Sequence, residues 1–125
     1  MDTYEPVAFV SIEADDDLVV SFFVTRPDDP SDGRSITLLR ALKWEYLLPD
    51  WERGVKVSDE GSPDEEEWQV NFLEEIRLSD STVELKSTHY ERKLDLSGLE
   101  KSDLKAIEKL LKKMNFDKRF NLAVA

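Results

Sequence analysis

The sequence predicts an α+β domain, a mostly antiparallel sheet of five or six strands with one C-terminal amphipathic helix packed on a face. Short segments rich in β-branched and aromatic residues recur over the first hundred residues, separated by turns rich in Asp, Pro and Gly. A single apolar stripe with helical spacing follows them. The chain has 125 residues, 40% of them hydrophobic, which suits a single globular domain over residues 1–125.

The first predicted hairpin joins a strand over residues 6–13 to a strand over residues 18–25. Asp15, Asp16 and Asp17 favour a turn between them, because Asp side chains bond nearby backbone groups and tolerate left-handed conformations. Both strands carry apolar residues at odd and even positions. We therefore expect this hairpin to be covered on both faces, as central strands are.

Residues 26–33 are rich in Pro, Asp and Gly and are predicted to form a loop. The even positions of residues 35–48 are mostly apolar, which favours a long strand, although a helix would also bring its leucines onto one face. We expect a short strand over residues 54–58 and a mobile acidic loop over residues 59–67.

The second predicted hairpin has its turn at Asp80-Ser81. Apolar residues alternate with polar ones from residue 68 to residue 78, and a new strand begins at residue 82. A two-residue turn pairs residue 78 with residue 83 and residue 76 with residue 85, which matches apolar side chains across the strands. The apolar parity then changes near residues 88–90, which indicates a bulge or a bend.

The predicted helix begins at Ser102 as its N-cap and ends near Asn115, a candidate left-handed C-cap. Its apolar stripe consists of Leu104, Ile107, Leu110, Leu111 and Met114. Phe116, Phe120 and Leu122 are expected to fold back onto the body, with a final short strand.

Charge is distributed unevenly along the chain. Residues 1–100 hold 10 basic and 25 acidic side chains, a net of −15, whereas residues 101–125 hold 7 basic and 3 acidic ones, a net of +4. An acidic body repels phosphate, so nucleic acid is a disfavoured partner even for the lysine-rich helix. The acidic surface suits a basic protein partner instead. We expect a cytoplasmic protein, because the sequence shows no export signal and no membrane-spanning segment.

Sequence motifs for catalysis are scarce. There is no cysteine, one histidine and no glycine-rich phosphate loop, so we expect no cofactor and no metal. The predicted register of the second hairpin places Glu74 opposite Ser87 and Phe72 opposite His89. Glu74, Ser87 and His89 are therefore the candidate acid–base cluster, with a structural polar patch or solvent-exposed side chains as the alternative.

Large aromatic residues are concentrated between residues 44 and 51. Most such residues belong to cores, but Trp, Tyr and Arg are also the usual anchors of interfaces. If the segment lies at a sheet edge, it forms a surface for a partner or a second copy, with Trp44, Tyr46, Trp51, Arg40 and Arg53 as the candidate binding residues. The sequence thus favours a non-catalytic protein that binds a macromolecule, such as an inhibitor or immunity-like domain. The alternative is a small-molecule-binding domain or minor enzyme with a pocket between sheet and helix.

Overall fold

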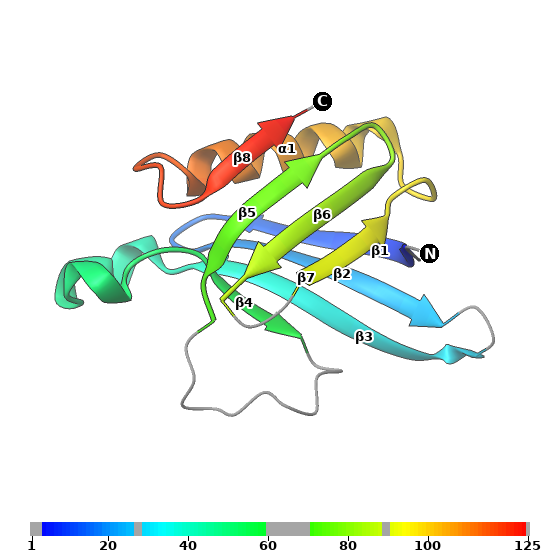
Figure 1. The fold of residues 1–125 in the computed structure, drawn as a ribbon, viewed down its shortest axis with the longest axis horizontal. Helices are drawn as coiled ribbons and strands as arrows, with labels where there is room; N and C mark the ends of the chain where they lie inside the picture. The colour runs from blue at the N-terminus through cyan, green and yellow to red at the C-terminus, as the bar shows by residue number, and fades with distance from the viewer. Residues whose placement is uncertain (1–3, 27–28, 60–70, 89–90, 125) are drawn as a thin grey trace.

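The structure is a computed structural model that describes residues 4–26, 29–59, 71–88 and 91–124 (Figure 1). These residues form one eight-stranded sheet, one α-helix and two short 3-10 helices. The strands are β1 Glu5–Ala14, β2 Leu18–Arg26, β3 Asp29–Arg40, β4 Lys56–Asp59, β5 Leu73–Leu78, β6 Thr82–Ser87, β7 Glu91–Asp95 and β8 Asn121–Val124. The helices are η1 Leu42–Leu47, η2 Asp50–Glu52 and α1 Lys101–Met114.

The sheet is mixed, with the strand order β4-β3-β2-β1-β7-β6-β5-β8. The pairs β1–β7 and β5–β8 are parallel and the other neighbours are antiparallel. The predicted α+β class is confirmed. The predicted number of five or six strands is too low, since the sheet has eight, and the sheet is mixed because two of its pairs run parallel.

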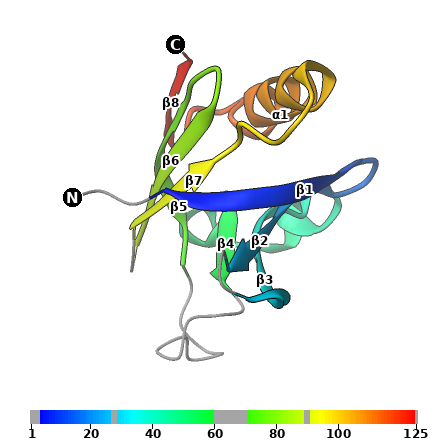
Figure 2. The same cartoon turned by 90° about the vertical axis from the view of Figure 1, so that its right-hand side faces the viewer.

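The sheet bends sharply, and α1 lies inside the bend. Figure 2 shows β5, β6 and β8 standing steeply to β1, with α1 in the angle between them. The predicted apolar stripe of α1 is confirmed: Ile107, Leu110, Leu111 and Met114 are buried, and Leu104 is partly buried against the core. The helix thereby covers the concave face of the sheet.

The first hairpin is covered on one face only, which corrects the prediction of two covered faces. Val20 and Phe22 on β2 are fully buried on the side of α1. On the other side, the rings of Phe9 and Phe23 stack with their centroids 4.2 Å apart, and Phe9 remains 55% exposed. The apolar residues of that outer face cover one another instead of meeting a second layer.

Residues 29–40 form one strand, so the predicted loop over residues 26–33 is wrong for the part that the structure describes. The backbone of residues 33–40 pairs with β2 in continuous antiparallel register. The strand then stops at Arg40, and the chain continues as 3-10 helix from Leu42. Residues 35–48 are therefore strand up to Arg40 and 3-10 helix from Leu42 to Leu47, which agrees with neither prediction for the whole segment.

The turn of the second hairpin and its first pairs are confirmed, since Leu78 pairs with Val83 and Ile76 with Leu85. A bulge at Glu74 then shifts the register, so that Ser87 pairs with Leu73. The predicted change in the alternation of apolar residues occurs between the antiparallel strands β6 and β7, where the chain reverses direction. Residues 68–70, 89 and 90 lie outside the described residues.

Asp59 is a core residue rather than the start of the predicted acidic loop, and residues 60–67 lie outside the described part of the chain. Its carboxylate is buried at the end of β4 and accepts hydrogen bonds from the Nε atoms of Arg34 and Arg92, each at 2.9 Å. Two guanidinium groups compensate for the burial of this charge.

Helix α1 begins one residue after Glu100, not after Ser102 as predicted. The backbone N–H of Glu100 donates to the Asp103 carboxylate at 3.3 Å, which satisfies a free backbone group at the helix start. Asn115 is the C-cap as expected, but it is not left-handed. The positive φ of 55° occurs three residues later, at Lys118.

Candidate protein-binding surface

Seven large hydrophobic side chains are exposed among the described residues, and five of them lie at one end of the molecule. We call these five the aromatic surface: Trp44, Tyr46, Leu47, Trp51 and Phe116. They come from η1, from η2 and from the segment between α1 and β8. These three segments lie together at the left end of the molecule in Figure 1.

The three-residue period of η1 explains why its aromatic residues face solvent. Side chains three positions apart share a face in a 3-10 helix. Glu45 is buried and Leu42 partly buried against the core, so residues 42, 45 and 48 form the inner face. Trp44 and Leu47 consequently share one outer face, and Tyr46 lies on the other outer face with Lys43.

Beneath the aromatic surface lies Arg40, which is 1% exposed. Its Nε and Nη2 atoms donate to the two oxygens of Glu45 at 2.9 Å each. Its Nη1 and Nη2 atoms donate to the two oxygens of Asp117 at 2.7 Å each, and Nη1 also donates to the carbonyl of Met114 at 2.7 Å. The Phe116 ring covers the guanidinium, with 4.4 Å from the Arg40 Cζ to the ring centroid.

Arg119 extends this cluster to η2. It bridges the carboxylates of Asp117 and Asp50, and its Nη1 also donates to the backbone carbonyl of Asp50 at 3.0 Å. The charge network Glu45–Arg40–Asp117–Arg119–Asp50 therefore ties β3, η1, η2 and the α1–β8 segment together. Every element that carries the aromatic surface is fixed by it.

The network perturbs the acidity of its members. Hydrogen bonds from Arg40, joined by those from Arg119, hold the pKa of the Asp117 carboxyl well below its ordinary value, although partial burial acts in the opposite direction. Burial by itself lowers the pKa of Arg40, but the hydrogen bonds to Asp117 and Glu45 outweigh it, so the pKa is raised. Both shifts favour the charged forms of Asp117 and Arg40, so this pair is ionised at neutral pH.

Acidic residues border the aromatic surface. The Lys43 ammonium lies 3.7 Å from the Asp16 carboxylate, so the β1–β2 turn is adjacent to η1. The exposed Asp15 lies in the same turn, and the exposed Glu13 lies just before it at the end of β1. Figures 1 and 2 both show this turn beside the segment that follows β3.

The predicted binding residues separate into two groups. Trp44, Tyr46 and Trp51 are 53%, 71% and 73% exposed, so they are available to a partner. Arg40 is buried and Arg53 partly buried, with its Nε donating to the carbonyl of Leu48 at 3.1 Å. Both arginines support the surface from within, which differs from the predicted role as anchors.

Sequence reasoning missed Phe116 as a surface residue and Glu45, Asp117 and Arg119 as its support. The spacing of three between Leu42, Glu45 and Leu48 is compatible with an inner Glu45, but Trp44 and Leu47 have the same spacing, so the sequence does not distinguish the two faces. Phe116 lies just beyond the end of the helix, between the polar residues Asn115 and Asp117. This position is only a weak sequence signal that its side chain is exposed.

The candidate acid–base cluster is not assembled as the predicted register implied. The bulge leaves Glu74 exposed, while Ser87 is buried and pairs with Leu73. Thr88 takes the place expected for His89, since its backbone N–H donates to the carbonyl of Phe72 at 3.0 Å. His89 itself lies outside the described residues, so a catalytic role for Glu74, Ser87 and His89 stays a prediction.

Within the described ranges, no three acidic or histidine side chains are grouped closely enough to hold a metal ion. No helix in the same ranges has the length and apolar character needed to cross a membrane. Comparison of the chain with protein-family models, curated proteins and solved structures finds no match. The geometry of the surface is therefore the basis for a functional proposal.

Proposed function

We propose that this chain is a cytoplasmic, non-catalytic domain that binds another protein, one with a basic surface, through the aromatic surface. The observation that carries the proposal is the exposure of two tryptophans, a tyrosine and a phenylalanine on a rigid support. Trp and Tyr are enriched among the residues that dominate binding energy. A fixed support also reduces the entropy lost on binding, because fewer side chains and loops have to be ordered.

Charge supports a basic partner. The chain carries a formal net charge of −11, and the acidic β1–β2 turn borders the aromatic surface. The arginines of the charge network are already paired with carboxylates of the same chain. A basic surface would therefore be attracted to this end of the molecule, and its lysines and arginines could also stack on the exposed rings.

The first test is a comparison of binding partners. Proteins from the source organism's lysate are captured on the wild-type chain and on Trp44→Ala/Trp51→Ala, and the affinity of a purified partner is then measured. Loss of two central aromatic anchors is expected to weaken the partner's binding at least about 30-fold. The matched control is Phe9→Ala. Phe9 is an exposed aromatic residue on the outer face of the β1–β2 hairpin and is not part of the aromatic surface, so its loss is expected to leave binding unchanged.

The same partner tests the role of charge. Asp15→Lys/Asp16→Lys is expected to slow association, and higher salt is expected to reduce the difference from wild type. A partner that binds the tryptophan variant as tightly as wild type would overturn the proposal. The proposal would also be overturned if the chain bound only a second copy of itself. Sedimentation would then show a dimer for the wild type and a monomer for the tryptophan variant.

A further inference from the structure

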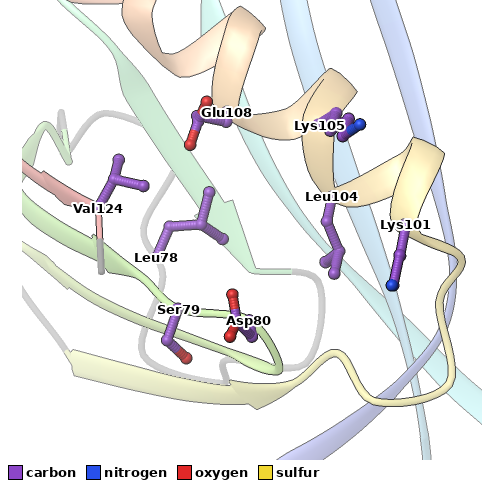
Figure 3. Close-up of a pocket in the computed structure, with 8 residues that line it drawn as sticks. All are labelled: Leu78, Ser79, Asp80, Lys101, Leu104, Lys105, Glu108 and Val124. Carbon is purple, nitrogen blue, oxygen red and sulfur yellow. The ribbon is translucent and has the colours of Figure 1, made fainter.

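A pocket of about 390 Å³ opens at the other end of α1, far from the aromatic surface (Figure 3). It lies between the first half of α1, the end of the parallel pair β5–β8 and the β5–β6 turn. Its apolar wall consists of Leu78, Leu104 and Val124. Ligand pockets commonly have volumes of about 300–1,000 Å³, so this one has room for a small molecule.

The wall is apolar because of the β5–β8 register. Ile76 pairs with Leu122 and Leu78 with Val124, so these side chains share the face of the sheet that α1 covers. Val124 nevertheless remains 43% exposed, since Leu104 is the one apolar side chain that α1 contributes to the lining at this end. A ligand with an aliphatic body would remove this surface from water, which favours binding.

Two opposite charges project at the mouth of the pocket. Figure 3 shows the Asp80 carboxylate on the turn and the Lys101 ammonium on the first residue of α1, whereas the Lys105 ammonium points away from Leu78. Neither Asp80 nor Lys101 forms an ion pair with any other residue that the structure describes.

Two other polar groups of the pocket, on Ser79 and Glu108, already have partners. The Ser79 hydroxyl hydrogen-bonds with Thr82 at 2.6 Å, and the Glu108 carboxylate lies 3.4 Å from Lys112. One carboxylate and one ammonium at the mouth are thus available to a ligand.

We propose that this pocket binds a small zwitterion with an aliphatic body, of the size of a dipeptide of aliphatic residues. Its ammonium group would pair with Asp80 and its carboxylate with Lys101, while its side chains contact Leu78, Leu104 and Val124. The termini of an extended dipeptide are at most ~7 Å apart, which suits two charged groups that do not pair with each other. A fatty acid could pair only with Lys101 and an alkyl amine only with Asp80, so each would leave one charged group at the mouth without a partner.

The test is a titration of the ¹⁵N-labelled full chain with the dipeptide Leu-Leu, followed by amide chemical shifts and calorimetry. Saturable shifts are expected at residues 78–80 and 101–108. Asp80→Asn and Lys101→Met are each expected to weaken binding about 10-fold or more, because each removes a charged partner. Lys109→Met is the matched control, since Lys109 is an exposed lysine of α1 that does not line the pocket.

Two modified dipeptides test the two charges from the ligand side. N-acetyl-Leu-Leu lacks the ammonium and Leu-Leu amide lacks the carboxylate, and each is expected to bind at least about 10-fold more weakly than Leu-Leu. Equal binding of all three compounds would overturn the proposal, as would a titration that leaves residues 78–80 and 101–108 unshifted. Because the pocket and the aromatic surface lie at opposite ends of α1, failure here leaves the protein-binding proposal standing.

Discussion

The guanidinium of Arg40 uses all five of its N–H groups on three acceptors: Glu45, Asp117 and the backbone carbonyl of Met114. The alternating pattern of β3 places residue 40 on the same face as Ile36 and Leu38, so the strand directs this side chain into the core. A buried charge is tolerated only when it is paired and hydrogen-bonded. Arg40 meets that condition by joining η1 to the end of α1.

Replacing Arg40 by Met is expected to reduce the free energy of unfolding by about 3–5 kcal/mol, because Glu45 is left as an uncompensated buried charge. Urea unfolding at pH 7 measures this loss. The double variant Arg40→Met/Glu45→Met is expected to recover part of it, since the orphaned carboxylate is gone. The matched control is Arg53→Met, which loses one hydrogen bond to a backbone carbonyl and should cost about 1 kcal/mol. Equal losses for the two arginines would contradict the role given to Arg40.

At the scale of elements, the spacing of apolar residues along the sequence correctly predicted the features that depend on local sequence alone. The pairs of the second hairpin and the buried stripe of α1 follow directly from apolar spacing. The bulge at Glu74 does not, because inserting one residue into a strand leaves its apolar composition unchanged. The 3-10 helix after Arg40 was missed for a related reason: the strand and helix patterns overlap in residues 35–48, and tertiary contacts of Glu45 decide between them.

The segment between α1 and β8 depends on an acid that stays ionised. Because the pKa of Asp117 is lower in the folded chain than its ordinary value of 3.8, its contribution to stability is fully present above about pH 5 and is lost as the pH falls below 4. Asp117→Asn is therefore expected to be less stable than wild type by a constant amount from pH 7 to about pH 5, and by a smaller amount at pH 3.

Urea midpoints measured between pH 3 and pH 7 test this expectation. Asp15→Asn, at an exposed aspartate, serves as the control and should show a constant, small difference from wild type. A gap between Asp117→Asn and wild type that stays constant down to pH 3 would show that Arg40 and Arg119 do not hold this carboxylate in solution.

At the scale of the whole molecule, sequence reasoning gave the class and missed the order of the strands. Parallel pairing joins segments far apart in the chain, and no local pattern in β1 or β8 indicates its distant neighbour. The candidate site was likewise predicted only in part. Residue type alone made the aromatics candidate binding residues, whereas the charge network that supports them joins residues as far apart as Arg40 and Asp117, 77 positions along the chain.

The bend at the β1–β7 pair divides the sheet into two halves, β4-β3-β2-β1 and β7-β6-β5-β8, which must be held together. Among the described residues, two pairs join β1 to β7, and one of them includes Pro6, which has no N–H to donate. Helix α1, in contrast, contacts β1 and β2 in one half and β8 in the other. The apolar stripe of α1 should therefore couple the halves more strongly than the hydrogen bonds between β1 and β7.

Ile107→Ala tests this coupling, because Ile107 is fully buried in the stripe. The substitution is expected to cost about 2–5 kcal/mol and to destabilise both halves equally. Hydrogen exchange of the β2 and β6 amides, which lie in different halves, reports each half separately. Both sets should lose protection by the same factor in Ile107→Ala, whereas exposed Ala106→Gly should cost only about 1 kcal/mol through helix propensity. If β2 lost protection while β6 kept it, the halves would be independent units and α1 would belong to one of them.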